Sequence, residues 1–426
     1  MIPILKTSEV TREEIFQRRD ALADVSGAVA EIIAAVRAEG DKALFRYMEQ
    51  FDGVHLSSLE VTPEELDAAL EQVEPELLAV LRRASENIRA FHSRQLRSGF
   101  LLTEQPGVVV GQRVLPMEKV GVTVPGGSTP LASTVLMNVI PAKLAGCREI
   151  VLVTPPDKSG AIPPVILAAA RLAGADRVFK LGGAQGIAAL ACGTESVPKV
   201  DKIVGPGGAF VAEAKKQVFG QVSIDMIAGP SEILIVSDGK SEARHLAADL
   251  LSQAEHDKNA SAVLVTDSMP LALAVQREIE VQLPRLLRAE IARASVEGNG
   301  KIIVTEDLSE AVEIANDLAP EHLELSVEDP FSLLSEIRHA GSVFLGRNCP
   351  EAMGDYYAGP NHTLPTGGTA RFSSPLSVDD FVKKTQFIYY SGDAMKKAAP
   401  DVERFALAEG LTGHARSAVI RTEEIK

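Results

Sequence analysis

The chain has 426 residues, of which 46% are apolar, 24% are charged and only 4% are aromatic, and its formal net charge is −15. This length favours two large domains over one core, and the scarcity of aromatic side chains favours a core of Val, Ile, Leu and Ala, as in parallel α/β sheets. The acidic charge argues against nucleic-acid binding, and apolar runs such as 165–170 are too short to span a membrane.

The cysteines and the N-terminus indicate the compartment. Cys147, Cys192 and Cys349 form no CxxC pair, so neither a disulfide framework nor a thiolate zinc site is expected. The first ten residues lack the basic-then-apolar pattern of a secretion signal. We therefore expect a cytoplasmic protein.

Residues 1–105 are predicted to form a helical segment that packs with the second of two α/β domains. Thr11 is a plausible cap for a first helix, Pro63 suits the first turn of another, and a long helix is expected from about Pro75 to Ser93.

Residues 106–231 are predicted to form a first α/β domain, because strand and helix patterns alternate with short glycine-containing turns. Its expected strands are 107–116, 120–127, 149–156, 177–183 and 202–208. Its expected helices are 163–174, 185–192 and 209–218. This βαβαβ order implies a parallel sheet with right-handed crossovers.

Residues 232–367 are predicted to form a second α/β domain. Its expected strands are 232–238, 261–267, 301–307 and 342–346, and its expected helices are 241–257, 269–293 and one that ends near Leu318. Residues 368–426 read as a tail with helices near 377–385 and 400–409. The fold prediction is thus two Rossmann-like, incompletely doubly wound parallel-sheet domains, an N-terminal helical segment and a small tail domain.

Two glycine loops, LGGAQG at 181–186 and VGPGG at 204–208, each follow a predicted strand and precede a predicted helix. Helix N-termini flanked by small residues bind anions, so either loop could hold a phosphate or a dinucleotide. Neither matches GxGxxG, and tight strand-to-helix turns explain them equally well.

Several polar residues are candidates for a metal site. Gln253 and His256 share one face near the end of a predicted helix, and Asp355 and His414 lie in loop-rich sequence. Imidazole, amide and carboxylate groups can all bind a divalent cation, although each could equally be an ordinary polar residue. Glu321 and His322 are adjacent in a predicted extended segment, so they could serve different steps of one reaction.

Eight stretches closely resemble the histidinol dehydrogenase family. They include the motifs SQAEH, APEHLEL, GPNHTLPTGGTARFSSPL and EGLTGHARS, and they run in order with no large gap. The matching stretches are 124–146, 182–207, 224–235, 249–257, 319–325, 341–346, 354–376 and 409–417.

This resemblance implies an NAD-dependent enzyme that oxidises L-histidinol to L-histidine, through the aldehyde, in two hydride transfers, the last steps of histidine biosynthesis. It also implies one zinc ion per active site and a homodimer with shared active sites, in which the C-terminal tail crosses to the partner subunit.

The resemblance also assigns residues. The zinc ligands fall on Gln253, His256, Asp355 and His414. The acid–base pair falls on His322, as the base in both oxidations, and Glu321, as the group that activates water. The substrate contacts fall on Ser231, His362 and Glu409, together with His322 and the four metal ligands. The NAD contact of the GGAQ motif falls on Gln185.

Three positions depart from the family pattern, which carries Tyr at Thr123, Asn at Gly208 and Ala at Gly186. Thr123 and Gly208 correspond to cofactor contacts. Loss of an aromatic face and of an amide hydrogen bond should each weaken NAD binding by about 1 kcal/mol.

Other classes of function stay open on the sequence. A paralogous zinc- and NAD-dependent dehydrogenase of another small amino alcohol or polyol would share the loops, but the match at Ser231, His362 and Glu409 argues against it. A zinc hydrolase that uses Glu321 would leave the glycine loops unexplained. A non-catalytic protein would have little reason to keep both Glu321 and His322 in a cleft.

Overall fold

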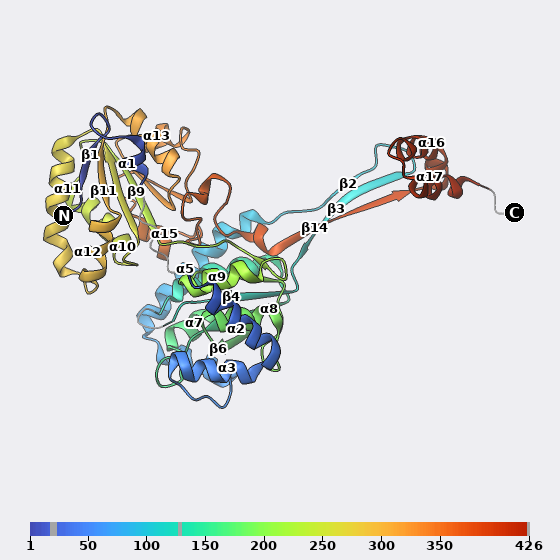
Figure 1. The fold of residues 1–426 in the computed structure, drawn as a ribbon, viewed down its shortest axis with the longest axis horizontal. Helices are drawn as coiled ribbons and strands as arrows, with labels where there is room; N and C mark the ends of the chain where they lie inside the picture. Colours follow the sequence, from blue (N-terminus) through green and yellow to red (C-terminus); the bar gives the residue numbers. More distant parts are fainter. Residues whose placement is uncertain (18–23, 127–129, 424–426) are drawn as a thin grey trace. The chain divides into compact units, whose positions relative to one another are not determined.

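The computed structural model describes residues 1–17, 24–126 and 130–423, and the chain divides into two compact units. Unit 1 consists of residues 1–95 and 117–381, and unit 2 of residues 96–116 and 382–426. Unit 1 contains two parallel sheets, and unit 2 contains a small antiparallel sheet (Figure 1). This architecture confirms the predicted α/β class with two Rossmann-like parallel sheets.

The first sheet of unit 1 has five parallel strands in the order β6-β5-β4-β7-β8. Side chains of its central strands alternate between two apolar cores, with Ile150 and Leu152 in one and Val151 and Val153 in the other. The strands are β4 (Lys119–Thr123), β5 (Glu149–Thr154), β6 (Arg177–Lys180), β7 (Lys202–Val204) and β8 (Ser223–Ile224). The end of the predicted strand 120–127, at Gly127, lies outside the described residues.

Helices cover both faces of this sheet. The helices of one face are α4 (Pro63–Gln72), α5 (Pro75–His92), α6 (Ala132–Ala145) and α7 (Pro164–Ala173). Those of the other face are α2 (Ser26–Glu39), α3 (Asp41–Tyr47), α8 (Gly183–Cys192) and α9 (Ala209–Val218). A π-helical turn, η1 (Met48–Asp52), and a 3₁₀ turn, η2 (Ser93–Gln95), follow α3 and α5.

The predicted packing of the N-terminal segment is mostly wrong. Its helices α2 to α5 pack on the five-stranded sheet, because their apolar faces meet the buried side chains of β4, β5 and β6. Only the first residues join the second sheet, through the edge strand β1 (Ile4–Lys6) and the short helix α1 (Arg12–Phe16), whose Ile15 is buried there.

The second sheet has six parallel strands in the order β1-β11-β10-β9-β12-β13. Besides β1, they are β9 (Glu232–Ser237), β10 (Ser261–Thr266), β11 (Lys301–Val304), β12 (His322–Ser326) and β13 (Ser342–Leu345). One face is covered by α10 (Ala243–Ala254), α11 (Met269–Gln282) and α12 (Ala289–Gly298), and the other by α1 and α13 (Leu308–Leu318). Short helices α14 (Pro330–Leu334) and α15 (Glu351–Tyr356) flank β13.

The long helix predicted over 269–293 is interrupted. It ends at Gln282, and a 3₁₀ turn, η3 (Leu283–Arg285), separates α11 from α12. Pro284 lies in this turn, and it has no backbone N–H with which to continue the helical ladder.

Two further predictions are wrong, and both concern the elements of unit 2. Residues 107–116 do not belong to the first α/β domain, because β3 (Val108–Pro116) pairs antiparallel with β2 (Phe100–Leu102) and β14 (Val382–Tyr390). The helix predicted over 377–385 is instead a 3₁₀ turn, η5 (Val378–Phe381), followed by β14. The β-branched and aromatic residues of VKKTQFIYY favour that strand.

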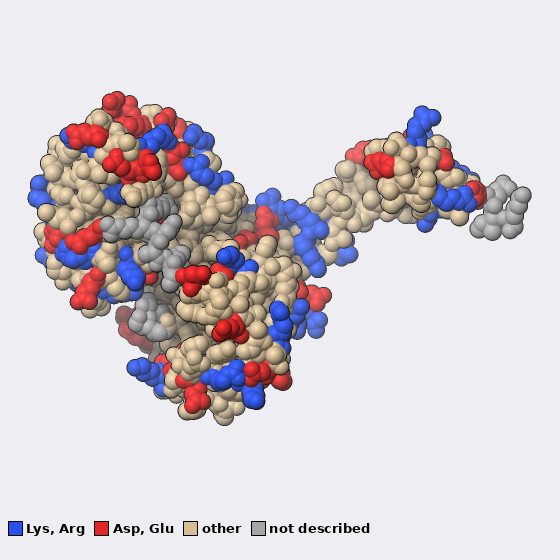
Figure 2. All heavy atoms as spheres, in the orientation of Figure 1, with Lys and Arg blue, Asp and Glu red and all other residues tan. Residues whose placement is uncertain are grey.

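The remaining elements complete both units. The 3₁₀ turn η4 (Thr369–Arg371) lies in unit 1, and α16 (Gly392–Ala408), α17 (Thr412–Val419) and the 3₁₀ turn η6 (Ile420–Thr422) lie in unit 2. On the face of unit 1 visible in Figure 2, acidic and basic side chains are interspersed. Within the described residues, no helix is both long enough and apolar enough to cross a membrane.

Candidate active site

Glu321 and His322 are held by one peptide segment of a neighbouring strand. Helix α13 ends at Ala319, which adopts a left-handed conformation (φ 47°), and β12 begins at His322. The N–H of Glu232, the first residue of β9, donates to Glu321 Oε2 at 2.9 Å, and His322 Nδ1 donates to the Glu232 carbonyl at 2.9 Å. Because a carbonyl only accepts, the neutral His322 ring has its basic nitrogen at Nε2.

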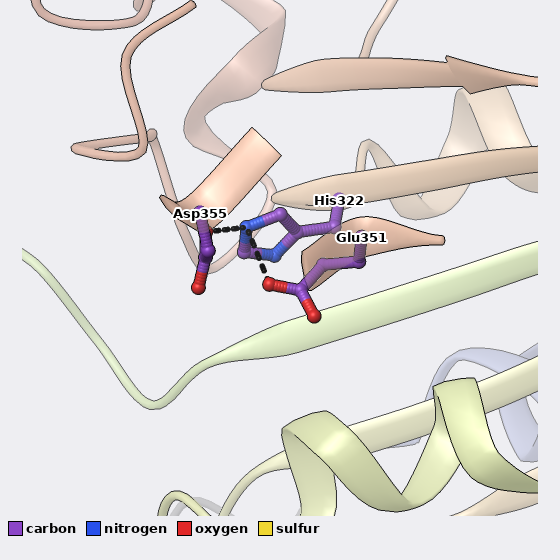
Figure 3. Close-up of side chains that lie close together, drawn as sticks. All are labelled: His322, Glu351 and Asp355. Carbon is purple, nitrogen blue, oxygen red and sulfur yellow. Dashed lines mark ion pairs between the residues drawn. The ribbon is translucent and has the colours of Figure 1, made fainter. Parts of the chain in front are cut away.

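The Nε2 atom of His322 faces two carboxylates from helix α15 (Figure 3). It lies 3.6 Å from Asp355 Oδ1 and 4.0 Å from Glu351 Oε1. Glu351 and Asp355 are four residues apart, so they share one face of the helix. Ligand atoms of the three residues lie within 4.8 Å of one another, close enough to share a metal ion.

Burial and charge shift the pKa values of this group in opposite directions. Burial by itself lowers the pKa of His322, but the charges of Glu321 and Asp355 outweigh it and raise the pKa to about 10. Burial raises the pKa of Asp355, but the close approach of His322 Nε2 and its charge, with the charge of His362, lower it well below its usual range. Without a metal ion, His322 and Asp355 therefore form a buried ion pair.

The two glutamates have raised pKa values for a shared reason. Burial raises the pKa of Glu321 to about 7, against the charge of His322. Burial, and then the nearby charge of Asp355, raises the pKa of Glu351 to about 8. Glu321 can therefore exchange a proton near neutral pH.

Gln253 and His256 lie at the end of α10, close to this group. Gln253 is 1% exposed, and among the described residues neither of its amide atoms has a hydrogen-bond partner. It still lowers the pKa of Glu351, so it lies near that carboxylate without a well-oriented hydrogen bond. Desolvation lowers the pKa of His256, whereas the charge of Asp355 raises it.

His362 connects the group to the five-stranded sheet. Its Nδ1 donates to the Asp355 carbonyl at 3.1 Å, and its Nε2 lies 3.3 Å from Thr134 Oγ1, in the first turns of α6. A small cavity beside it is lined by His322, Ser342, Phe344, Gly354, Asp355, Pro360, Asn361, His362 and Leu364. Ser231, which is half-buried, directly precedes Glu232.

Glu409 and His414 belong to unit 2. Glu409 ends α16, His414 lies in the first turn of α17, and both side chains are exposed. Unit 1 therefore brings together Ser231, Gln253, His256, Glu321, His322, Asp355 and His362 of the predicted site, whereas Glu409 and His414 stand on the other unit.

The predicted cofactor residues lie at the carboxyl edge of the five-stranded sheet. Thr123 ends β4 and is buried, Gln185 is buried in the first turn of α8, and Gly208 is the exposed N-cap of α9. Among the described residues, neither helix has a side-chain cap, and a Cβ built on Gly208 would meet no atom within 4 Å beyond the adjoining chain. Open helix N-termini of this kind suit a pyrophosphate.

The donor atoms near Asp355 fit a zinc ion. Among the proposed ligands, both amide atoms of Gln253 are buried and, within the described part of the chain, make no hydrogen bond. Buried polar atoms without partners are costly, and a cation bound by nitrogen and oxygen donors would satisfy them.

Sequence reasoning missed two residues of this site. Glu351 has a detectable signal, because the spacing of CPEAMGD places it one helical turn before Asp355. Glu232 acts through its backbone, so its residue type carried no signal.

The family described as histidinol dehydrogenase matches residues 16–422. A histidinol dehydrogenase of Syntrophotalea carbinolica is 55% identical over 402 residues (94% of this chain, 93% of that protein), and one of Geobacillus kaustophilus is 53% identical over 397 residues (93% and 94%). The crystal structure of histidinol dehydrogenase from Elizabethkingia anophelis superposes with a TM-score of 0.93 at 38% identity, covering 99% of this chain and 98% of that one.

Proposed function

Because the chain belongs to the histidinol dehydrogenase family, an NAD-dependent oxidoreductase family of histidine biosynthesis, we propose residue roles for the oxidation of L-histidinol to L-histidine. The observation that carries the proposal is the Glu232 peptide segment, which orients both Glu321 and His322. As a biosynthetic enzyme, the protein is proposed to work in the cytoplasm.

His322 is the proposed base for the alcohol. Its Nδ1–H is fixed on the Glu232 carbonyl, so Nε2 can take the hydroxyl proton while the carbon gives up its hydride. NAD, when bound, accepts that hydride. The same nitrogen takes a second proton in the oxidation of the hydrated aldehyde.

Glu321 is the proposed base for water. Its carboxylate accepts one hydrogen bond, from the Glu232 N–H, and its raised pKa of about 7 suits proton exchange near neutral pH. As a carboxylate it would take a proton from the water that adds to the aldehyde. Two groups with distinct environments thus serve two distinct proton transfers.

Gln253, His256 and Asp355 are proposed to hold zinc, with His414 as the fourth ligand. Zinc, when bound, supplies a Lewis acid that orients the imidazole and amine nitrogens of the substrate. Asp355 is central to this proposal, because its charge already acts on both His256 and His322. Ser231, His362 and Glu409 are proposed to contact the substrate, with the Glu409 carboxylate beside the cationic amine.

Gln185, Thr123 and Gly208 are proposed to contact NAD. The uncapped N-termini of α8 and α9 support a pyrophosphate site, and the open space at Gly208 leaves room for it. Thr123 offers no aromatic face, so contacts at this position should contribute little.

A homodimer with shared active sites is proposed from the surface of unit 2. Large apolar side chains of its sheet and of α16 are exposed, and folded monomers rarely leave such patches uncovered. They include Phe100, Leu101, Leu102, Ile388, Tyr389 and Phe405. In this arrangement Glu409 and His414 would complete the site of the partner subunit.

One assay tests the activity. Purified protein with zinc, NAD and L-histidinol should reduce NAD, followed at the nicotinamide absorbance band, with two NADH formed per histidinol. Reduction only with another amino alcohol or polyol would favour a paralogous dehydrogenase. Amide or ester hydrolysis without any NAD reduction would favour a zinc hydrolase.

A further inference from the structure

The β7–α9 loop of unit 1 is held by a buried ion pair that takes no part in the proposed chemistry. The side chains of Lys215, on α9, and Asp225, just after β8, are only 2% and 1% exposed and form a salt bridge. Burying two charges is costly, and an apolar pair of similar size often stabilises a core as well. Stability alone is therefore a weak explanation for this pair.

Both members of the pair bind the same residue, Gly205. Lys215 Nζ donates to the Gly205 carbonyl at 2.9 Å, and the Gly205 N–H donates to Asp225 Oδ2 at 2.7 Å. Gly205 has a φ of +111°, and a Cβ there would lie 2.1 Å from the Thr123 carbonyl oxygen. The ion pair thus satisfies both backbone polar groups of Gly205, which lies between β7 and α9.

In the rest of the loop, Gly207 packs against α9 and Gly208 is exposed. A Cβ on Gly207 would meet Val211 at 2.4 Å, so that part of the loop rests on the helix. Gly208 is exposed, and within the described residues it has no neighbour at its Cβ position beyond the adjoining chain and begins α9 without a side-chain cap. The loop is held at Gly205 and Gly207, while the first N–H groups of α9 have no partner within the helix.

We propose that Lys215 and Asp225 are positioning residues for the cofactor: they hold the 205–208 loop in the conformation that receives the phosphates of NAD. This inference rests on the proposed NAD site. A backbone anion site binds well only if its N–H groups are already oriented, and the two charges supply that order from inside the protein.

Asp225 also contacts the start of the segment that leads to Glu232. Asp225 Oδ1 also accepts from the Met226 N–H at 2.6 Å, at the start of the segment that leads through Ser231 to Glu232. This contact joins neighbouring residues, so the pair orders only the start of the segment and leaves the orientation of Glu321 and His322 to the Glu232 backbone.

The chain offers a matched control in a second lysine–carboxylate pair. Lys202 lies on β7, at the amino end of the strand that precedes the same loop, and its Nζ is 3.2 Å from Asp380 Oδ1. Its side chain is 7% exposed. Lys202→Met and Asp380→Asn should lower the melting temperature without touching the loop.

The experiment compares these controls with Lys215→Met and Asp225→Asn. Calorimetric titration with NAD should show at least a tenfold weaker Kd in the Lys215 and Asp225 variants, and their KM for NAD should rise in parallel. Histidinol KM and zinc content should stay within twofold of wild type. The controls should keep the wild-type Kd for NAD, and Lys215→Arg should restore part of the binding.

Folded Lys215 and Asp225 variants that bind NAD within twofold of wild type would overturn the inference, as would an equal loss in the controls. If the single variants do not fold, Lys215→Met/Asp225→Leu removes both charges together and is judged by the same Kd. Hydrogen exchange of the wild type supplies a variant-free readout, because NAD should protect the amides of 208–210. Absence of that protection, in an enzyme that does oxidise histidinol, sinks this inference and leaves the proposed function standing.

Discussion

The two ring nitrogens of His322 have different partners. Its Nδ1 is occupied by the Glu232 carbonyl, so only Nε2 can receive a proton from the substrate. Glu321 is held by the same residue of β9, through the Glu232 N–H. The two adjacent residues are proposed to have different roles because the neighbouring strand holds each of them differently.

Substitution should separate these roles. His322→Ala should slow both oxidations about a thousandfold, whereas Glu321→Gln should slow mainly the aldehyde step, by roughly a hundredfold. Because the Glu321 pKa is about 7, protonation below that pH should slow the wild-type aldehyde step, and Glu321→Gln should lose this pH dependence. Stopped-flow rates with histidinol and with the aldehyde check both points. Wild-type aldehyde oxidation by Glu321→Gln would contradict the water-activating role.

Metal removal should change the charge of His322. The charges of Glu321 and Asp355 hold its pKa at about 10 when no cation is bound, so the ring stays protonated through neutral pH. A cation on Asp355 would compete for that carboxylate and lower the pKa of His322. Histidine NMR titrations of chelator-treated and zinc-loaded protein measure the difference, with His55 as an exposed reference. An unchanged His322 pKa would argue against zinc at Asp355.

Helix α15 is the element that organises the metal side of the site. It follows Pro350, it has no side-chain cap of its own, and it carries both Glu351 and Asp355 on one face. The Glu351 N–H, in its first turn, donates to Glu324 Oε1 at 2.7 Å. Glu324 lies on β12, two residues after His322, so one strand orients both the base and the helix opposite it.

Loss of this contact should weaken the metal site. Glu324→Ala leaves the first N–H of α15 without its acceptor and should lower zinc affinity by about 10- to 100-fold, as measured by competition with a chelator. Glu324→Gln keeps an acceptor oxygen and should retain most of the affinity. Glu313→Ala, on the exposed face of α13, is the matched control. Equal zinc affinity in all three variants would remove Glu324 from the metal site.

In the whole molecule, opposite edges of two parallel sheets carry the proposed cofactor residues and the proposed acid–base pair. The cofactor residues follow the carboxyl ends of β4, β6 and β7, where ligands of α/β sheets usually bind. The acid–base pair instead lies at the amino ends of β9 and β12. His362 joins the two, because it contacts both Asp355 and Thr134 of α6.

Subunit mixing tests the shared site. If His414 and Glu409 act on the partner subunit, an inactive His414→Ala homodimer and an inactive His322→Ala homodimer should form mixed dimers with one intact site. About a quarter of wild-type activity should return after random exchange of equal amounts, because half of the dimers are mixed and each has one intact site of two. Pairing of His322→Ala with Glu321→Gln is the control, because both changes fall on unit 1. No recovery, with exchange confirmed by mass spectrometry, would contradict the shared site.

The α/β class, both runs of parallel strands and the family could all be predicted from the amino-acid sequence alone. Strands such as β5 and β9 read clearly because they are buried on both faces and are therefore apolar throughout. The motifs around Glu321, His322 and Asp355 were equally plain, since imidazole and carboxylate groups are the residue types that acid–base and metal chemistry requires.

Features that depend on contacts between distant parts of the chain emerge only from the folded structure. The sequence predicts a helix near 377–385, but pairing with β3 makes the second half of that segment part of the strand β14. Helices α2 to α5 were assigned to the wrong sheet, because an amphipathic helix does not specify which apolar surface it covers. Glu232 and the Lys215–Asp225 pair were invisible for the same reason: they act on backbone groups far along the chain, and no residue pattern records that contact.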